Sequence, residues 1–288
     1  MSMMKWNRFL AMLLALLLLS GCGTGAEPET TTPVETPAPV ETTVPDMTTA
    51  PAQTEMPTEP AVTEPPETEP VPEEVELSKQ ERYEINIFLS NFSEQQFRDI
   101  YWPPNPDGGV FCAAEADVYE ILYFVWNHTN YNTYQTEDVQ KDGEWFSGIS
   151  LELISSKSER FFGRPLTKED VEQAGRDFRL IDGLVCRPMA FGDSYLEMAA
   201  ADALYDLGNG TMRVDFTVYS PTIEAEYDGI TSAGGINSRD IYYYTPQEVV
   251  DSGYFVPYRK GTALVKPKTL ENGRESYELL TYELLDTE

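Results

Sequence analysis

Thr-Met-Arg-Val-Asp-Phe-Thr-Val-Tyr-Ser, residues 211–220, is the stretch that decides the fold. Apolar side chains occupy every second position in it, and polar or amphipathic ones lie between them. A period of two places all the apolar side chains on one face of a β-strand. Gly208-Asn209-Gly210 separates this stretch from an earlier one, 195–207, so the two are predicted to pair as an antiparallel hairpin.

Two more hairpins are predicted on the same grounds. Their strands and turns are 178–181 and 184–188 across Asp182-Gly183, and 262–267 and 277–285 across Glu271-Asn272-Gly273. Consecutive hairpins build an antiparallel sheet with one covered face. Residues 177–288 are therefore predicted to be mostly β, interrupted by a long loop over 221–240 and a short helix that begins at Thr245-Pro246.

Residues 78–176 carry a helical period instead. Ser78 and Glu81 have the spacing of a capping box, which predicts a helix start. The apolar positions that follow, at i, i+3, i+4 and i+7, are Ile85, Phe88, Leu89 and Phe92. An alternation over 83–89 makes a strand the alternative, and the cap favours the helix.

The rest of this region is predicted to hold further helices with turns between them. Helices are expected at 113–128, at 151–162 before Gly163, and from Thr167. Between them, a polar, turn-prone segment is expected at 127–136, a turn at Asp142-Gly143, and a short strand at Trp145-Phe146. The fold class is therefore α+β, with a helical module over 78–176 packed on an antiparallel sheet of sequential hairpins. An NTF2-like cone has the same order of elements, and the analogy rests on that order alone.

The N-terminus resembles a bacterial lipoprotein signal. Lys5 and Arg8 precede an apolar run that ends in Leu19-Ser20-Gly21-Cys22, and these four residues match the lipobox. The run is too short to span a bilayer, which favours a cleaved signal over a transmembrane helix. The resemblance implies cleavage before Cys22, diacylglycerol on its sulfur, and a protein anchored on the outer face of the cell membrane. A plain signal peptide and an uncleaved anchor are the alternatives.

Residues 23–77 are predicted to be a disordered stalk between the signal peptide, 1–22, and a globular head, 78–288. The stalk repeats Thr, Pro and Glu, and contains no aromatic residue. Such a composition cannot form a core, and its prolines and like charges extend the chain. The alternative is a linker whose length hardly matters.

The charge of the chain narrows the choice of partners. Its net charge is −29, and the stalk holds 13 Asp/Glu without Lys or Arg, so 36 acidic and 18 basic residues remain in the head. Phosphate-backbone binding needs a basic surface, which argues against nucleic acid. The same sign disfavours lying on anionic lipid, whereas a cationic partner is compatible with it.

Residues that commonly carry catalysis are scarce. Cys112 and Cys186 are predicted to be separate buried thiols, with a disulfide or one reactive thiol as alternatives. His128 is the only histidine, and one helix over 113–128 would place it about 24 Å from Cys112, which argues against a thiol–imidazole pair. It is instead interpreted as a helix C-terminal residue favoured by the dipole. No catalytic, cofactor-binding or metal-ligating residue is predicted, and a carboxylate pair is uninformative among so many acids.

Two short stretches carry a resemblance to a known family. Asn86-Ile87-Phe88-Leu89-Ser90-Asn91-Phe92-Ser93-Glu94 resembles the opening motif of a family of uncharacterised clostridial secreted or lipid-anchored proteins, and Arg160-Phe161-Phe162-Gly163 is similar to its second signature. The resemblance covers roughly residues 78–165 and implies a lineage and a shared helical module, without a reaction. The phenylalanines are interpreted as core, and Asn86, Asn91 and Ser93 as capping or bridging between helices.

Tyrosines near the long loop are the remaining candidate site. Tyr242, Tyr243, Tyr244, Tyr254 and Tyr258 are predicted to bind a ligand, since exposed tyrosines stack on sugars or grip peptides. The alternative is that they pack one face of the sheet. The leading hypothesis is a cell-surface binding or interaction module, whose partner is another envelope protein or a wall glycan. A carboxylate-dependent cell-wall hydrolase and a structural envelope-assembly protein are the alternatives.

Overall fold

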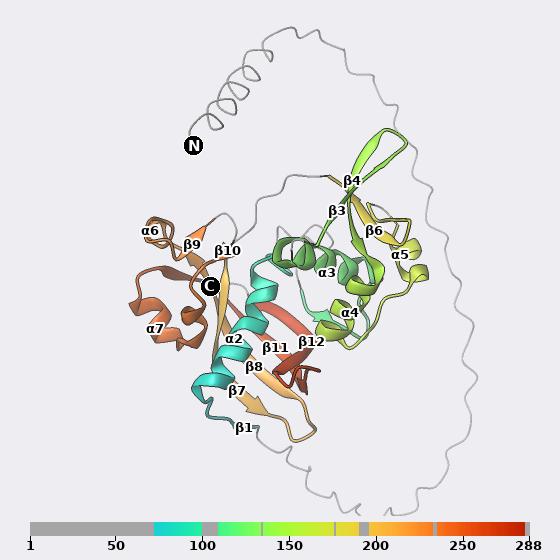
Figure 1. Ribbon diagram of the computed structural model, residues 1–288. Coiled ribbons are helices and arrows are strands. Elements are labelled where there is room, and N and C mark those ends of the chain that lie inside the picture. Colours follow the sequence, from blue (N-terminus) through green and yellow to red (C-terminus); the bar gives the residue numbers. More distant parts are fainter. Residues whose placement is uncertain are drawn as a thin grey trace, which may run out of the picture. The chain divides into compact units, whose positions relative to one another are not determined.

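The structure is a computed structural model that describes residues 72–99, 109–133, 135–175, 177–189, 196–232 and 235–285 (Figure 1). The predicted signal peptide, the predicted lipid attachment at Cys22 and most of the predicted stalk lie outside the described residues. Among the helices of the described part, none is long and apolar enough to cross a membrane. The described part has the α+β class that the residue patterns predict.

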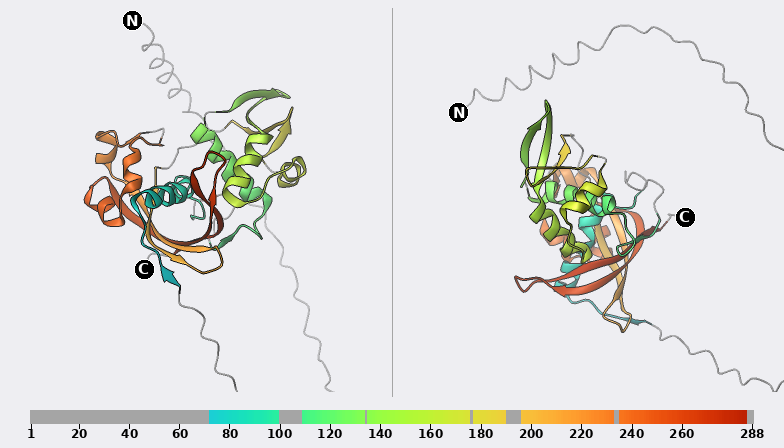
Figure 2. Two further views of the ribbon diagram at one scale, coloured as in Figure 1. Left: turned by 60° about the horizontal axis from the view of Figure 1, so that its bottom comes forward. Right: turned by 90° about the vertical axis from the view of Figure 1, so that its right-hand side faces the viewer.

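A six-stranded antiparallel sheet forms the centre of the head. Its strands, in spatial order, are β1 (Glu73–Glu74), β7 (Met198–Asp206), β8 (Met212–Pro221), β11 (Phe255–Thr269), β12 (Glu275–Leu285) and β2 (Phe111–Cys112). The sheet curls around helix α2 (Lys79–Ser93), which lies against its concave face (Figure 2). The two hairpins predicted here are confirmed, although β11 begins at Phe255 instead of Thr262. Because β1 lies within the predicted stalk, the folded head begins before Ser78.

Helix α2 carries two buried stripes. Its start is confirmed, because the Ser78 hydroxyl accepts from the Glu81 amide and the Glu81 carboxylate accepts from the Ser78 amide. The predicted apolar stripe packs in the core. A second stripe is polar. Its side chains hydrogen-bond the backbone of β7 and of Glu197, the residue just before β7, along the part of this edge that β1 leaves unpaired. The members of this stripe are Asn86, Ser90 and Ser93.

This polar stripe corrects one sequence interpretation. Ser93 bonds the residue before β7 and not another helix. Asn86 bonds both a strand and a helix: it accepts from the Ala201 amide of β7 and donates to the carbonyl of Tyr242, which lies in the short 3₁₀ helix η1 (Arg239–Tyr243). Asn91 donates to the Ile87 carbonyl and contacts His128 on a neighbouring helix, as a bridge between helices would. The stripe satisfies backbone groups that would otherwise be buried without partners at the sheet edge.

Three further helices follow α2 in the chain; the first two pack against it, and the third packs on the first of them. They are α3 (Val118–Thr133), α4 (Leu151–Phe162) and α5 (Lys168–Ala174). The prediction of α4 with a left-handed Gly163 cap is confirmed (φ 64°), as is the start of α5 at Thr167. The helix predicted at 113–128 is wrong at both ends. The helix begins at Val118, where Asp117 accepts from the Tyr119 amide, and the residues before it, 111–112, pair with β12. At the other end it continues to Thr133, within the predicted turn-prone segment.

A second antiparallel sheet flanks these helices (Figure 1). Its strands, in spatial order, are β3 (Glu137–Lys141), β4 (Glu144–Ser150), β6 (Leu184–Pro188) and β5 (Arg179–Ile181). The Asp182-Gly183 hairpin is confirmed, but it belongs to this sheet and not to the central one. Residues 78–176 are therefore not purely helical. Asp142 and Gly143 both have positive φ, 53° and 85°, the geometry that lets a two-residue turn join β3 to β4.

Small elements cover the opposite end of the central sheet. They are α6 (Ile223–Tyr227), β9 (Thr231–Ser232), β10 (Gly235–Ile236), η1 (Arg239–Tyr243) and α7 (Pro246–Asp251). The long loop predicted over 221–240 is thus partly wrong, while α7 with its Thr245 capping box is confirmed. A separate cluster of buried side chains, including Tyr219, Ile241 and Phe255, holds these elements on the sheet.

Candidate functional site

The five predicted tyrosines do not form one surface. Tyr242 is buried, and its hydroxyl donates to Glu94 Oε1 over 3.2 Å. Tyr243 stacks on a helix residue, Tyr83, with ring centroids 4.3 Å apart. Tyr254 donates to Asp228 over 3.1 Å. Each of these rings already has a partner within the protein, which is closer to the packing interpretation than to an open tyrosine platform.

Of the remaining two tyrosines, Tyr244 packs against the buried cluster that includes Ile241, and Tyr258 lies outside this cluster. The partly buried Tyr244 joins the residues that surround Ile241. Tyr258 lines a narrow cavity at the end of α2, together with acidic residues that the sequence did not single out. Only Tyr258 of the five therefore leads to a polar cavity.

The cysteines and the histidine are structural in their surroundings. Cys186 is buried and Cys112 is half-buried, and both are free thiols on different sheets. His128 is not at a helix end, as the sequence suggested, but inside α3, where its Nε2 lies 2.8 Å from Asn91 Oδ1. Burial, and then the nearby charges of Lys157 and Arg160, lower the pKa of His128 to about 3, so its ring is neutral at pH 7.

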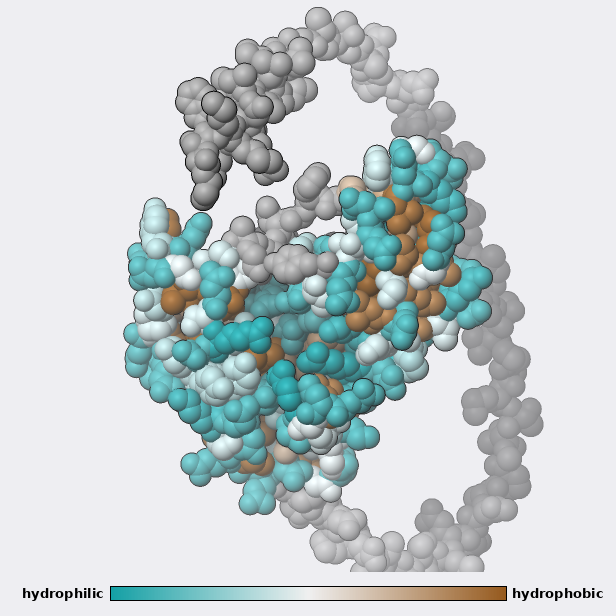
Figure 3. Space-filling model, viewed as in Figure 1, coloured by the Kyte–Doolittle hydropathy of each residue, from teal (hydrophilic) through white to brown (hydrophobic). Residues whose placement is uncertain are grey.

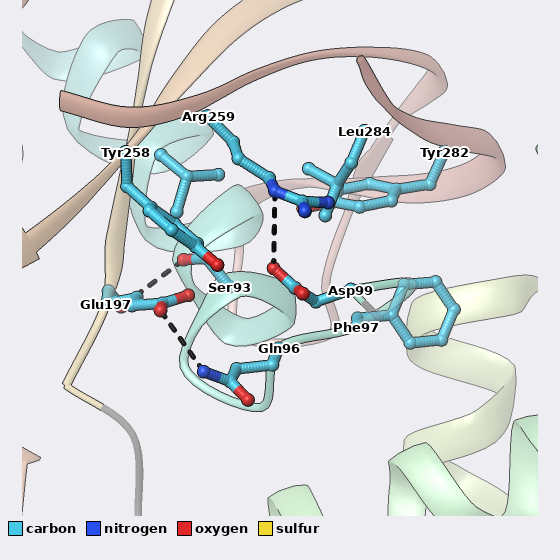
Figure 4. Close-up of a pocket in the computed structure, with 10 residues that line it drawn as sticks. Ser93, Gln96, Phe97, Asp99, Glu197, Tyr258, Arg259, Tyr282 and Leu284 are labelled. Atoms are coloured by element: carbon cyan, nitrogen blue, oxygen red, sulfur yellow. Dashed lines mark hydrogen bonds and ion pairs between the residues drawn. The ribbon is translucent and has the colours of Figure 1, made fainter. Parts of the chain in front are cut away.

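The cavity has about 190 Å³ of space between atoms, part of it open to solvent, and it is too narrow for a water-sized sphere. Figure 4 shows its polar side chains converging from α2, from the turn after it, and from strands β11 and β12. The lining residues are Ser93, Gln96, Phe97, Asp99, Glu197, Val218, Tyr258, Arg259, Tyr282 and Leu284.

A strained turn after α2 supplies two of these groups. Gln96 and Arg98 have positive φ, 52° and 64°, which side chains other than glycine adopt at a cost. The turn reverses the chain within a few residues, so that Phe97 enters the core and Asp99 enters the cavity with only 1% of its surface exposed. The side chain of Arg98, between them, does not line the cavity and forms an ion pair with Glu120 of α3.

A β-bulge in β11 supplies two more of the residues that line the cavity, Tyr258 and Arg259. The pairing of β11 with β8 shifts register at Tyr258, so that Pro257 faces Tyr219 and Arg259 faces Val218. Successive residues of a regular strand point to opposite faces, and a bulge removes that restriction. As a result, Tyr258 and Arg259 line the same cavity although they are neighbours in the sequence.

The polar groups form a short network. Gln96 Nε2 donates to Glu197 Oε1 over 3.3 Å, and Ser93 Oγ donates to the Glu197 carbonyl over 3.3 Å. Arg259 Nε lies 3.6 Å from Asp99 Oδ2 and forms the ion pair drawn in Figure 4. Two carboxyl groups thus share one cavity with a single guanidinium.

Burial dominates the protonation of this network. It raises the pKa of Glu197 to about 7, with a smaller rise from Asp99, against the hydrogen bond from Gln96. Burial, then the charge of Asp99 and a smaller contribution from a hydrogen bond to its carboxylate, raise the pKa of Tyr258 against the charge of Arg259. Burial raises the pKa of Tyr282 as well, so both phenols stay protonated at neutral pH. Glu197 is therefore the group of this site that exchanges a proton near pH 7.

Three buried polar atoms at the cavity have no hydrogen-bond partner. They are Gln96 Oε1, Asp99 Oδ1 and the Tyr282 hydroxyl, on residues that are 8%, 1% and 0% exposed. Buried polar groups are nearly always satisfied, so an unsatisfied group calls for a specific explanation. In Figure 4 the Gln96 oxygen points away from Glu197, whereas the Asp99 carboxylate faces the interior of the cavity. The unpartnered groups on Asp99 and Tyr282 are those most directly associated with the cavity.

The site does not resemble a metal centre. No group of three or more His, Cys, Asp or Glu side chains that could hold a metal ion occurs among the described residues. Two carboxyls, a guanidinium and two phenols can bind a polar ligand or move a proton. Sequence reasoning missed all of these groups except Tyr258, because one acidic residue among 36 in the head carries no signal.

No protein-family model, curated protein or solved structure matches this chain. The fold and the site define its class: an α+β head whose curled antiparallel sheet and central helix close a buried carboxylate cavity.

Proposed function

We propose that this chain is a lipoprotein anchored through Cys22 outside the cytoplasm, and that its head binds a small ligand at the Glu197 cavity. The lipobox and the acidic, proline-rich stalk support the location. The observation that carries the binding function is the set of unpartnered buried polar atoms around one cavity. The buried pocket replaces the tyrosine surface as the ligand site, with Tyr258 common to both.

The ligand group that best fits the cavity is an ammonium. Asp99 Oδ1 lacks a donor, Glu197 has one side-chain donor, and Arg259 balances only one of the two carboxylates. An ammonium brings both a positive charge and three N–H donors. Amines of this kind occur on amino sugars and peptides of a cell wall. Because the cavity admits no water-sized sphere, a ligand can enter only if the half-buried wall residues Tyr258 and Arg259 move.

The direct test measures amine binding and its pH dependence. Glucosamine and ethanolamine are titrated into the full chain and followed by calorimetry, with N-acetylglucosamine as the neutral matched control. Binding is expected for the amines only. For ethanolamine, whose ammonium keeps its proton over this range while that of glucosamine does not, binding should be tighter at pH 8 than at pH 6, because the Glu197 carboxyl loses its proton between them. Glu197→Gln should remove that pH dependence. Equal binding of glucosamine and its acetylated control would contradict the ammonium assignment.

One observation favours a hydrolase as the second candidate. Glu197, with a pKa of about 7, shares a cavity with an Asp99 that is paired to Arg259. Two carboxyl groups in one cavity, one of them with a raised pKa, are the arrangement with which glycosidases divide the roles of acid and base. Incubation with peptidoglycan fragments across pH tests it: turnover that Glu197→Gln abolishes would support hydrolysis, and absence of turnover would leave binding as the function.

A further inference from the structure

Exposed apolar side chains gather at the end of the head that contains α6 and α7. Eight large apolar residues of the described part are more than 40% exposed, and half of them come from residues 223–256. These four are Ile223, Tyr227, Val250 and Val256, and we call them the apolar patch. Single exposed apolar residues are ordinary, whereas a contiguous group rimmed by polar residues marks an interaction surface. Figure 3 shows hydrophobic surface among hydrophilic residues at this end.

Backbone contacts bring the patch together. Thr222, which precedes α6, donates its amide to the Tyr254 carbonyl over 2.9 Å and its hydroxyl to the Gly253 carbonyl over 3.1 Å. The start of α6 therefore lies beside the start of β11, next to Val256. The Gly253 amide in turn donates to the carbonyl of Val250 at the end of α7.

Helix geometry adds the fourth member. Ile223 and Tyr227 are four residues apart on α6, so their side chains lie on one side of that helix. The Tyr254 hydroxyl donates to Asp228, directly after α6, which ties the far end of the helix to the same segment. The two most exposed members of the patch, at 60% and 80%, are thus adjacent and held in place.

The rim of the patch is acidic. Residues 222–256 contain six carboxylates and one basic residue, Arg239, all of them exposed, and Lys79 and Arg82 of α2 lie near one of the carboxylates, Glu248. The acidic residues are Glu224, Glu226, Asp228, Asp240, Glu248 and Asp251. Two of them alternate with the apolar residues of α6 itself, so a partner that covers Ile223 and Tyr227 also meets these carboxylates.

We propose that the patch docks a basic segment of another protein, one that presents apolar side chains between lysines or arginines. Charge selects this occupant. A second copy of the chain would bring the same acidic rim against itself, and an anionic lipid surface would be repelled in the same way. A basic amphipathic segment covers the apolar residues and neutralises the rim together. Since only four apolar side chains take part, the complex is expected to be transient.

A peptide of defined composition tests the proposal. A fluorescent peptide built only of Leu and Lys is titrated into the full chain, and a Leu and Glu peptide is the matched probe. The double variant Ile223→Ser/Tyr227→Ser is expected to bind the basic peptide about tenfold more weakly. The control Val110→Ser, at a similarly exposed apolar residue outside the patch, should change binding less than twofold. Equal melting temperatures show that all the chains are folded.

Charge variants and two further measurements complete the test. Glu226→Lys should weaken binding more than Glu271→Lys, which lies in the exposed β11–β12 turn. The proposal would be overturned if the double variant and Val110→Ser weakened binding equally, or if Glu226→Lys and Glu271→Lys did, because the attraction would then be diffuse. It would also be overturned if the basic peptide bound no more tightly than the acidic one. A dimer in sedimentation that the double variant abolishes would assign the patch to a second copy instead. Binding to phosphatidylglycerol vesicles through the patch would assign it to lipid.

Discussion

Glu197→Gln is expected to stabilise the folded head at high pH and to leave it nearly unchanged at low pH. The raised pKa of Glu197 means that the folded state prefers the protonated carboxyl. Below pH 4.5 the group is protonated in the folded and the unfolded chain alike, and it has no effect on stability. As the pH rises toward 7, the unfolded chain loses the proton first, so the free energy of unfolding falls.

The size of the effect follows from the displacement of the pKa. A rise from 4.5 to about 7, at about 1.4 kcal/mol for each pKa unit, corresponds to a loss of about 3 kcal/mol above pH 7. Glutamine stays neutral at every pH, and its side-chain oxygen can accept the Gln96 hydrogen bond that the carboxyl accepts. The variant should therefore gain up to about 3 kcal/mol over the wild type at pH 8.

Urea unfolding of the full chain at pH 4.5, 6 and 8, followed by tryptophan fluorescence, measures this difference. Glu271→Gln is the matched control, because it removes the same charge from an exposed turn without touching the cavity. Comparison with the control separates the Glu197 contribution from the general repulsion within an acidic chain. A stability difference between Glu197→Gln and wild type that is the same at all three pH values would refute the reasoning.

The remaining predictions concern the cap of α4, the polar stripe and the anchor. Gly163→Ala should lower the free energy of unfolding by about 1–2 kcal/mol, measured as a lower urea midpoint, because Gly163 has a left-handed backbone and a new Cβ would clash with Glu278. Gly273→Ala is the control: its φ is also positive but the space around it is open, so it should cost less. Asn86→Ala should cost roughly 1–3 kcal/mol, since it leaves buried backbone groups unpaired, and an unchanged midpoint would contradict that role. Cys22→Ala should release the protein or leave an uncleaved precursor, and unchanged cleavage and lipid labelling would refute lipidation.

Local signals predicted the elements whose causes are local. The Ser78, Thr167 and Thr245 caps each form because a side chain bonds an amide three residues away, and the interaction needs nothing more distant. The Asp182-Gly183 turn likewise contains its own cause, two residues with positive φ. Such features can be read from a few consecutive residues.

Elements that depend on distant partners were predicted less well. Strand β3 has no apolar alternation, and it forms because β4 offers a hydrogen-bonding edge. The helix predicted from residue 113 begins only at Val118, because Cys112 and Phe111 just before it pair with β12, which lies far along the sequence. The Glu197 cavity needs both a strained turn at Gln96 and a bulge at Tyr258, and neither has a marker in the residue pattern.

The sequence by itself predicted a lipoprotein-type signal and an excess of acidic over basic residues in the head, and it determined the alternating strand at 211–220 and the helix starts. Each of these depends on composition or on neighbours along the chain. Only the tertiary structure decided that Tyr242 is buried, that α2 covers the edge of β7, and that Glu197 shares a cavity with Asp99. The physical reason is that burial is a property of the packed chain: it raises the pKa of one glutamate among many, and no local pattern shows which one.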